Sequence, residues 1–440
     1  MTKTVAFHTL GCKVNQYDTQ AMRELLVQAG YRPVPFQDPA DIYVINTCTV
    51  TGTGDRKSLQ LARRIRRERP GALLVLCGCL AQKQGERLLE EAEADLVLGT
   101  QARGEIVSLL GQVISDGKPR CAVSPLLPGM PFESLNISEV SGHTRATVKI
   151  QEGCNNHCTY CIIPSVRGPI RSRPLEDLRR EVTRLRDRGF CEIVLTGIHL
   201  ASYGREDPAR SLSLLDAIRT VHEIDGIERI RLGSLEPIIA TETFCQALRS
   251  LPKVCPQFHL ALQSGSDTVL ARMKRRYNTS QYLAAADRLR SVYPQAALTT
   301  DILTGFPGET EEEFQETARF IERAGYARIH VFPYSPREDT PASLLPGQIS
   351  PAEKERRARE LIALGNHVAR RYLETWIGKT SMLLPEEKQA GCWEGYTPEY
   401  IRVSMPPDAV CESGKQIPVM LTGLTSRGMS AVPMPPFPQG

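Results

Sequence analysis

The chain has 440 residues, of which 41% are hydrophobic and 24% are charged, as in globular proteins with more than one domain. No apolar run approaches the roughly 20 residues of a membrane helix. The first residues have no signal-peptide layout, so we expect a cytoplasmic protein without a membrane partner. The 13 cysteines are more informative, because clustered thiols in a reducing cytoplasm indicate metal ligation or redox chemistry rather than disulfides.

Residues 1–125 alternate short apolar runs with helical patterns, which predicts a small parallel α/β domain. The expected strands are TVAFHTLG, DIYVINT and ALLVLCG, and the expected helices include 18–29 and 56–68. Residues 126–143 are rich in Pro, Ser and Gly and are predicted to form a linker.

A second β/α series occupies residues 144–376. Its six expected strands are TVKIQ, EIVLTG, RIRLGS, FHLAL, LTTDIL and RIHVFP, with helices such as 176–188 and 310–323 between them and a basic helix, 351–374, at the end. Six units predict an incomplete (β/α)6 barrel rather than a closed one of eight. Residues 377–440 contain the strand-like pieces TSMLLPEE, YIRVSMP and IPVMLTGL, separated by Gly and Pro, which predict a small all-β barrel.

Three cysteines lie close together just after the first strand of the second series. Cys154, Cys158 and Cys161 form a C-x3-C-x2-C pattern in EGCNNHCTYCIIP. Three thiolates on one loop hold three irons of a four-iron cluster and leave the fourth open. S-adenosylmethionine needs such an open iron, which its amino and carboxylate groups chelate. The alternative is a zinc site with His157 as a fourth ligand.

This loop resembles that of the radical S-adenosylmethionine superfamily. The resemblance implies a [4Fe-4S] cluster that passes one electron to S-adenosylmethionine and cleaves it to a 5′-deoxyadenosyl radical. Cofactor contacts are then expected at the carboxyl ends of the barrel strands. The candidate cofactor-binding residues at these positions are Gly197, Ser234, Glu236, Gln263, Arg275 and Asp301. Each alone is equally compatible with barrel packing or capping. No catalytic acid or base is expected, because the radical attacks an unactivated carbon.

Three further cysteines each stand just past an expected strand of the first domain. Cys12, Cys48 and Cys79 are separated by 36 and 31 residues, about one βα unit each. Such positions lie at the same edge of a parallel sheet, so three distant thiolates can converge there. Cys77 is the competing ligand, and the alternative for all three is that they are buried apolar residues. We prefer Cys79 because Cys77 still belongs to the apolar run.

The segments GCKVNQYDT, NTCTVTGTGDRKS and GCLAQ resemble the N-terminal domain of the radical methylthiotransferases. The resemblance implies that Cys12, Cys48 and Cys79 hold a second, auxiliary [4Fe-4S] cluster that carries the sulfur to be transferred. The final segment, GKT…WEGYTPEYIRV, resembles a TRAM domain. One S-adenosylmethionine then supplies a methyl group to that sulfur. A second generates the radical that removes hydrogen from the substrate.

The string LGCKVNQ around Cys12 resembles the branch that modifies threonylcarbamoyladenosine in transfer RNA. This predicts conversion of threonylcarbamoyladenosine to its 2-methylthio form. The expected partners are a transfer RNA anticodon loop carrying that base, a flavodoxin-like or ferredoxin-like electron donor, and a sulfur donor. The alternatives are isopentenyladenosine in transfer RNA, an aspartate of a ribosomal protein, or a non-catalytic iron–sulfur protein that binds RNA.

Charge gives mixed support for an RNA partner. Segment 55–69 has seven Lys or Arg against two acidic residues, a stripe that suits phosphates but also a solvated helix face. Residues 378–440 contain five basic and six acidic residues, so this segment lacks the excess of positive charge expected of a simple RNA-binding barrel.

Overall fold

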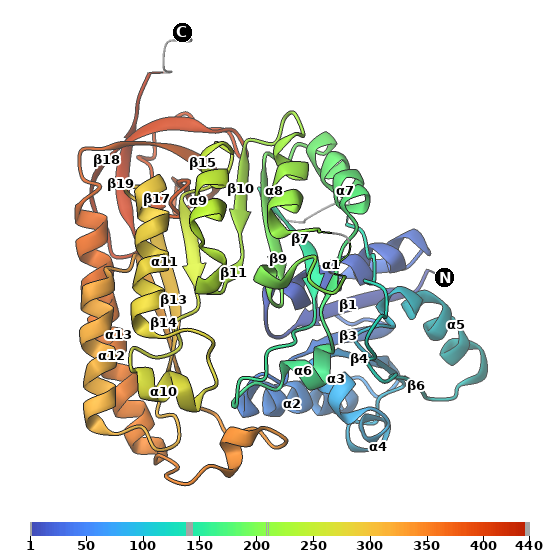
Figure 1. The fold of residues 1–440 in the computed structure, drawn as a ribbon. Helices are drawn as coiled ribbons and strands as arrows, with labels where there is room; N and C mark the ends of the chain where they lie inside the picture. Colours follow the sequence, from blue (N-terminus) through green and yellow to red (C-terminus); the bar gives the residue numbers. More distant parts are fainter. Residues whose placement is uncertain (1, 138–143, 208, 210, 436–440) are drawn as a thin grey trace.

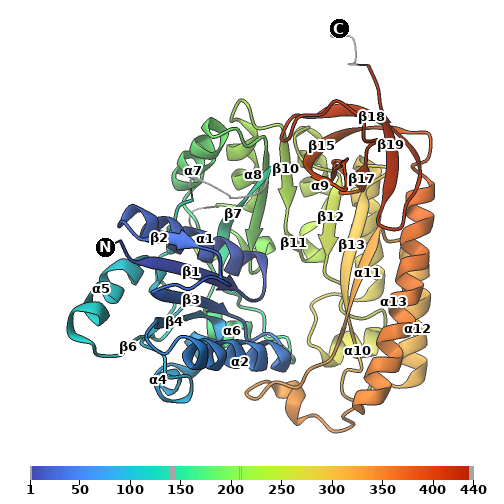
Figure 2. The same cartoon turned by 180° about the vertical axis from the view of Figure 1, so that it is seen from behind.

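The computed structural model describes residues 2–137, 144–207, 209 and 211–435. Figures 1 and 2 show an N-terminal α/β part, a central open barrel flanked by helices, and a small β-barrel against one end of the central barrel. The predicted fold class is thereby confirmed. In the described part of the chain, no helix is long and apolar enough to cross a membrane.

The N-terminal part is a parallel sheet in the order β2-β1-β3-β4-β5-β6. Its strands are β1 (Thr4–Thr9), β2 (Arg32–Val34), β3 (Ile42–Thr47), β4 (Leu73–Gly78), β5 (Leu96–Leu98) and β6 (Arg120–Ala122). Its helices are α1 (Lys13–Gln28), α2 (Gly52–Glu68), α3 (Cys79–Gln84), α4 (Arg87–Glu91) and α5 (Ile106–Asp116). Helix α2 begins earlier than predicted because the Thr51 side chain caps it, accepting a hydrogen bond from the Gly54 N–H at 3.1 Å.

The predicted linker is not a free tether where the structure describes it. Residues 123–137 form no helix or strand, but Leu135 and Ile137 are buried in the core of the central barrel. The Tyr17 hydroxyl of α1 donates a hydrogen bond to the Leu135 carbonyl. The composition signals the irregular backbone but not its packing. Residues 138–143 lie outside the described residues.

The central barrel consists of two four-stranded sheets, β10-β9-β7-β8 and β11-β12-β13-β14. The strands are β7 (Arg145–Glu152), β8 (Arg171–Ser172), β9 (Glu192–Gly197), β10 (Arg229–Leu232), β11 (Ser234–Leu235), β12 (Gln257–Leu260), β13 (Ala297–Thr304) and β14 (Arg328–Pro333). The predicted strand RIRLGS is divided at Gly233: β10 pairs with β9, whereas β11 pairs with β12. All of the strand pairs are parallel except the β7–β8 pair.

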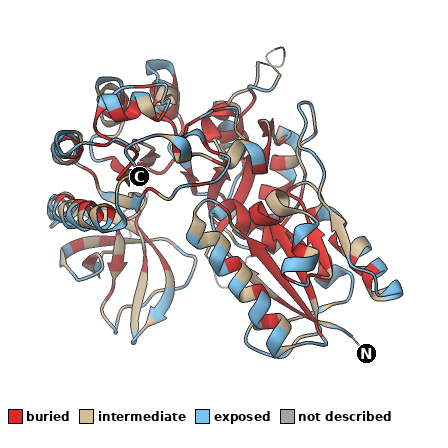
Figure 3. Cartoon of the chain, turned by 90° about the horizontal axis from the view of Figure 1, so that it is seen from below, coloured by how far each residue is buried: buried red, intermediate tan, exposed pale blue. Residues whose placement is uncertain are grey.

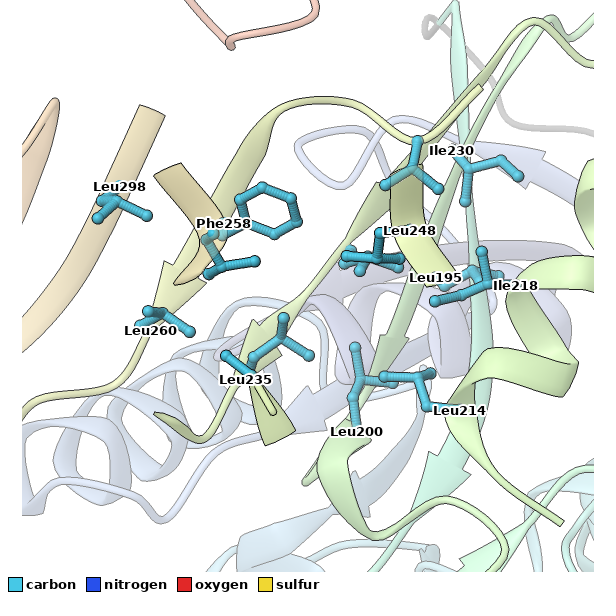
Figure 4. Close-up of a cluster of buried hydrophobic side chains, with 14 of the residues drawn as sticks. Leu195, Leu200, Leu214, Ile218, Ile230, Leu235, Leu248, Phe258, Leu260 and Leu298 are labelled. Carbon is cyan, nitrogen blue, oxygen red and sulfur yellow. The ribbon is translucent and has the colours of Figure 1, made fainter. Parts of the chain in front are cut away.

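Helices cover the outer face of these strands (Figure 1). They are α7 (Leu175–Asp187), α8 (Leu214–His222), α9 (Glu242–Arg249), α11 (Thr279–Val292), α12 (Glu311–Ala324) and α13 (Pro351–Glu374). Two short helices, α6 (Ile163–Arg167) and α10 (Asp267–Arg272), follow strand ends. The core lies between strands and helices, with Leu195 of β9, Ile218 of α8 and Leu248 of α9 packed together (Figure 4). Figure 3 shows the same division, with buried strands inside and exposed helix faces outside.

The C-terminal part is a closed barrel in the order β15-β16-β17-β19-β18. Its strands are β15 (Thr380–Gln389), β16 (Cys392–Tyr396), β17 (Arg402–Ser404), β18 (Ile417–Leu424) and β19 (Met429–Pro433). The three predicted strand segments correspond to β15, β17 and β18. Strands β16 and β19 were not predicted, because short strands of mixed polarity give little alternation to detect.

Candidate active site

Three cysteines of the N-terminal part lie at one edge of its sheet. Cys48 and Cys79 directly follow Thr47 and Gly78, which are register partners in β3 and β4. Cys12 follows the neighbouring strand β1, after Gly11. A Cβ at Gly11 would lie 2.9 Å from Cys48 Cβ, and its φ of +103° disfavours any other residue. Gly11 therefore lets the Cys12 turn approach Cys48 closely.

Electrostatics also place the three thiols in one site. Burial raises the pKa of Cys79 to about 11, and the charge of Arg167 opposes this rise, while Cys12 and Cys48 add to it. Burial raises the pKa of Cys48 too, and Cys12 again adds to the effect. Each thiol thus lies within range of the others. Cys77 instead directs its Sγ to the Ile45 carbonyl at 3.6 Å within a hydrophobic cluster.

The second triplet lies on the loop after β7. The Cys154 N–H donates to the Gly168 carbonyl at 3.0 Å, and the Cys161 N–H donates to the Cys158 carbonyl at 3.0 Å. The pKa of Cys161 is raised to about 12, mainly by burial and in smaller part by the thiols of Cys158 and Cys154. The loop is folded tightly enough for its three thiols to interact.

Glu236 and Arg275, both predicted cofactor contacts, meet beside this loop. An Arg275 nitrogen lies 3.1 Å from Glu236 Oε1, and another donates to Cys158 Sγ at 3.1 Å. His199 Nε2 lies 3.0 Å from Glu236 Oε2, and Asn156 donates to the same carboxylate at 3.3 Å. Burial raises the pKa of Glu236, but His199 and Arg275 outweigh it, so the net pKa is lowered. Glu236 therefore stays ionised.

The other four predicted contacts are arranged less tightly. Gly197 packs on Gln151, whose Oε1 accepts a hydrogen bond from the His199 N–H at 2.6 Å. Because His199 also contacts Glu236, Gly197 is connected to Glu236 through these two residues. Ser234 is exposed in β11. The Gln263 N–H donates to the Asp301 carbonyl at 2.9 Å, but the Asp301 carboxylate lies 3.3 Å from His259. Asp301 thus faces His259, and no contact joins it to the group around Glu236 among the described residues.

Sequence reasoning did not single out Asn156 or Arg167, and it pointed to His199 only as part of the segment HLASYG after Gly197. His199 lies in the segment that follows Gly197, where its position after β9 is a usable signal. Asn156 lies between two predicted ligands and carries no signal of its own. Arg167 is six positions beyond Cys161, and nothing in the sequence pattern indicates that its side chain is directed toward Cys79.

The donor sets suit iron–sulfur clusters better than zinc. The candidate ligands at each site are three cysteines, and a four-iron cluster takes thiolates. Across the described ranges, no three His, Cys, Asp or Glu side chains are grouped so that they could hold a single metal ion. The ionised, buried Glu236 beside the second triplet suits a cationic ligand such as the amino group of S-adenosylmethionine.

Comparisons with known proteins agree with the fold. Residues 4–99 match the model described as "Uncharacterized protein family UPF0004", and residues 148–321 match that of the radical SAM superfamily. A solved radical S-adenosylmethionine methyltransferase, TsrM from Kitasatospora setae, has a TM-score of 0.57 and 16% identity over 78% of this chain and 77% of that chain. The barrel and its site thus define a radical S-adenosylmethionine enzyme, a class that uses S-adenosylmethionine and a [4Fe-4S] cluster.

Relatives define the family more narrowly. Threonylcarbamoyladenosine tRNA methylthiotransferase MtaB of Bacillus subtilis is 40% identical over 91% of this chain and 90% of that protein. The protein of the same name from Thermotoga maritima is 36% identical over 91% of each. A tRNA-2-methylthio-N(6)-dimethylallyladenosine synthase of Pelotomaculum thermopropionicum is 34% identical over 94% of each. The chain belongs to the radical S-adenosylmethionine methylthiotransferase family, on the side of its threonylcarbamoyladenosine tRNA members.

Proposed function

We propose that this protein transfers a methylthio group to C2 of threonylcarbamoyladenosine in transfer RNA, in the cytoplasm. The supporting observation is the proximity of the two thiol sites. Helix α6, which follows Cys161, packs against α3, which begins at Cys79 (Figure 1). Cys79 shares a small hydrophobic cluster with Ile162 and Val166. Sulfur insertion needs a site that forms a carbon radical and a site that supplies sulfur close together.

When bound, the two [4Fe-4S] clusters and S-adenosylmethionine supply the radical and the methylated sulfur. The chain's own residues bind and orient these groups. We assign Cys154, Cys158 and Cys161 to one cluster and Cys12, Cys48 and Cys79 to the other. Glu236 orients the cofactor near the first cluster, and Arg275 holds both Glu236 and Cys158 in place.

The inner face of the barrel offers charges for the substrate. Alternation along β12, β13 and β14 turns His259, Asp301 and His330 away from the helix-covered core. Lys13 of α1 is exposed, but the surrounding protein desolvates its ammonium group and lowers its pKa. Tyr400 opposes this effect, and Arg145 of the barrel adds to it. Lys13 thus lies within electrostatic range of Arg145 and Tyr400, and a lysine at this position is suited to the anionic threonylcarbamoyl group.

Helix α2 supports a polyanionic partner. Arg56, Lys57, Arg63, Arg64 and Arg67 are exposed on it. Arg64 and Arg67 lie 3.9 and 4.0 Å from Glu68, which is the acidic partner of both. Such a stripe neutralises phosphates in a salt-dependent way. An anticodon loop fits the chemistry because its unpaired bases can be splayed out and read individually.

The test is a competition assay with the anaerobically reconstituted protein. It compares threonylcarbamoylated transfer RNA, isopentenylated transfer RNA and the ribosomal protein as substrates, with nucleosides and peptides measured by mass spectrometry. A pocket that pairs with polar groups rejects an analogue lacking them strongly. We expect product from the first substrate, and preference for either of the others would overturn the substrate assignment. Flavodoxin and ferredoxin serve as trial electron donors, and the sulfur donor is identified by supplying candidate sources singly.

A further inference from the structure

One arginine connects the two thiol sites. Arg167 is the last residue of α6, and its side chain is fully buried. Its Nε donates a hydrogen bond to Cys79 Sγ at 3.2 Å. Its charge also lowers the pKa of Cys48 and Cys79, although burial dominates at both thiols. Arg167 thus acts on the N-terminal triplet, although it belongs to the chain segment of the other triplet.

The guanidinium group of Arg167 is held by residues of both the N-terminal part and the central barrel. Nη1 lies 3.2 Å from Asp18 Oδ2 of α1 and 3.1 Å from Glu152 Oε1 of β7. Nη2 donates to Asn15 Oδ1. Buried charges need such partners, because an uncompensated buried charge is strongly destabilising. The orientation of Nε toward Cys79 is therefore determined by the fold.

Asp18 and Glu152 belong to a larger buried network. Arg103 contacts both carboxylates, and Lys149 Nζ lies 2.5 Å from Asp18 Oδ1 and 3.2 Å from Glu152 Oε2. Neither Arg103 nor Lys149 makes a hydrogen bond to a cysteine among the described residues. Arg103 therefore offers a matched control: it is a buried arginine of the same network without a sulfur contact.

Arg275 is the counterpart at the other site, where it donates to Cys158 Sγ at 3.1 Å. Each triplet thus has its own buried arginine with an N–H directed at a cysteine sulfur. Hydrogen bonds and positive charge beside cluster sulfurs stabilise the reduced form, which carries one more negative charge, and so raise the reduction potential.

On the basis of the proposed function, we infer that Arg167 is a positioning residue that raises the reduction potential at the Cys12, Cys48 and Cys79 site and aligns that site with the radical-forming loop. Bonding of a carbon-centred radical to a methylthiolate sulfur forms one C–S bond and leaves one surplus electron. When bound at Cys12, Cys48 and Cys79, an oxidised [4Fe-4S] cluster would accept that electron and be reduced by one electron, and a higher reduction potential favours this. The Arg167 Nε–H directed at Cys79 Sγ provides this property without contacting the substrate.

The experiment uses reconstituted full-length protein with Arg167→Lys, Arg275→Lys or Arg103→Lys. Lysine keeps the charge but does not reproduce the guanidinium fork. Midpoint potentials come from redox titrations followed by electron paramagnetic resonance, with signals assigned from Cys158→Ala and Cys48→Ala proteins. We expect Arg167→Lys to lower the equilibrium constant for reducing the auxiliary cluster at least tenfold, which is about 59 mV for one electron. The other cluster should not change, and Arg275→Lys should give the reverse pattern.

Arg103→Lys should leave both potentials within the error of the titration. If Arg167→Lys causes selective loss of auxiliary iron while Arg103→Lys keeps full iron, the role at this site is also supported. An unchanged auxiliary potential in Arg167→Lys would overturn the inference, as would equal effects of Arg167→Lys and Arg103→Lys. Because potentials and iron content are measured without transfer RNA, failure of the substrate assignment would leave this result interpretable. Circular dichroism checks that each variant is folded.

Discussion

The two thiol triplets are built in different ways. Cys154, Cys158 and Cys161 lie on one short loop after β7, whereas Cys12, Cys48 and Cys79 follow three different strands, β1, β3 and β4, which are neighbours in a parallel sheet. The loop site is encoded locally. The sheet-edge site is a property of the tertiary fold, so it depends on the stability of the whole N-terminal part.

The largest expected effect separates the two sites by function. Cys158→Ala should abolish reductive cleavage of S-adenosylmethionine, because it removes a ligand from the cluster that supplies the electron. Cys48→Ala should keep some cleavage but abolish methylthiolation. We expect roughly eight irons per chain in the unaltered protein and about four in each variant, from two four-iron clusters. Full product formation by Cys48→Ala, or stoichiometric zinc in place of iron, would show that the assignment of two clusters is wrong.

A second test addresses the charge beside the loop site. Glu236→Gln should raise the KM for S-adenosylmethionine about 10- to 100-fold, since a charged hydrogen bond contributes about 1.5–3 kcal/mol and about 1.4 kcal/mol is tenfold. Iron content should stay unchanged, because Glu236 is not a proposed ligand. The matched control is Asp301→Asn, whose carboxylate faces His259 instead. If both variants raised the KM equally, the Glu236 assignment would lose its basis.

A smaller effect is expected for the cation next to the sheet-edge site. Lys13→Gln should lower kcat/KM for threonylcarbamoylated transfer RNA about tenfold, which is the loss of roughly one ionic hydrogen bond. Iron content and cleavage of S-adenosylmethionine without RNA should remain at the level of the unaltered protein. Lys57→Gln, on exposed α2, controls for general loss of phosphate attraction. Equal losses in the two variants would argue against a specific role for Lys13.

The smallest effect concerns the support of the loop site. The Thr159 hydroxyl donates to the Arg272 carbonyl at 3.0 Å, and Arg272 pairs with Glu313 at 2.6 Å. The Arg272 guanidinium holds the pKa of Glu313 at about 2. The pair therefore stabilises the fold fully above the unfolded pKa of about 4.3, and this contribution is lost as pH falls toward 2.

Glu313→Gln should lower the free energy of unfolding by less than about 1 kcal/mol at pH 7, as for partly exposed pairs. The difference between variant and unaltered protein should shrink as the pH is lowered from 5 to 3. Urea titrations at several pH values measure it. A difference that grows on acidification would contradict the depressed pKa of Glu313.

The contrast between the sites also explains what the sequence predicts. The loop triplet follows from spacing alone, and the sheet-edge triplet follows once TVAFHTLG, DIYVINT and ALLVLCG are interpreted as neighbouring parallel strands. The ligand assignments, cofactor contacts and domain bounds stay predictions. The sequence does not predict the contacts of Arg167 and Asn156, because their side chains contact atoms that are distant along the chain. The division at Gly233 escaped notice because an apolar run does not reveal a change of strand partner.

The attachment of the C-terminal barrel limits how its role can be studied. Arg229 donates to the Met382 carbonyl at 2.6 Å, and Arg231 donates to the Pro398 carbonyl at 2.9 Å. Both arginines are buried and also pair with Glu192. Truncating the chain after α13 would remove these acceptors and expose to water a surface of the central barrel that the β-barrel normally covers. A truncated protein would therefore combine lost RNA contacts with a damaged central barrel. Substitutions on the exposed surface of the intact β-barrel are the informative route.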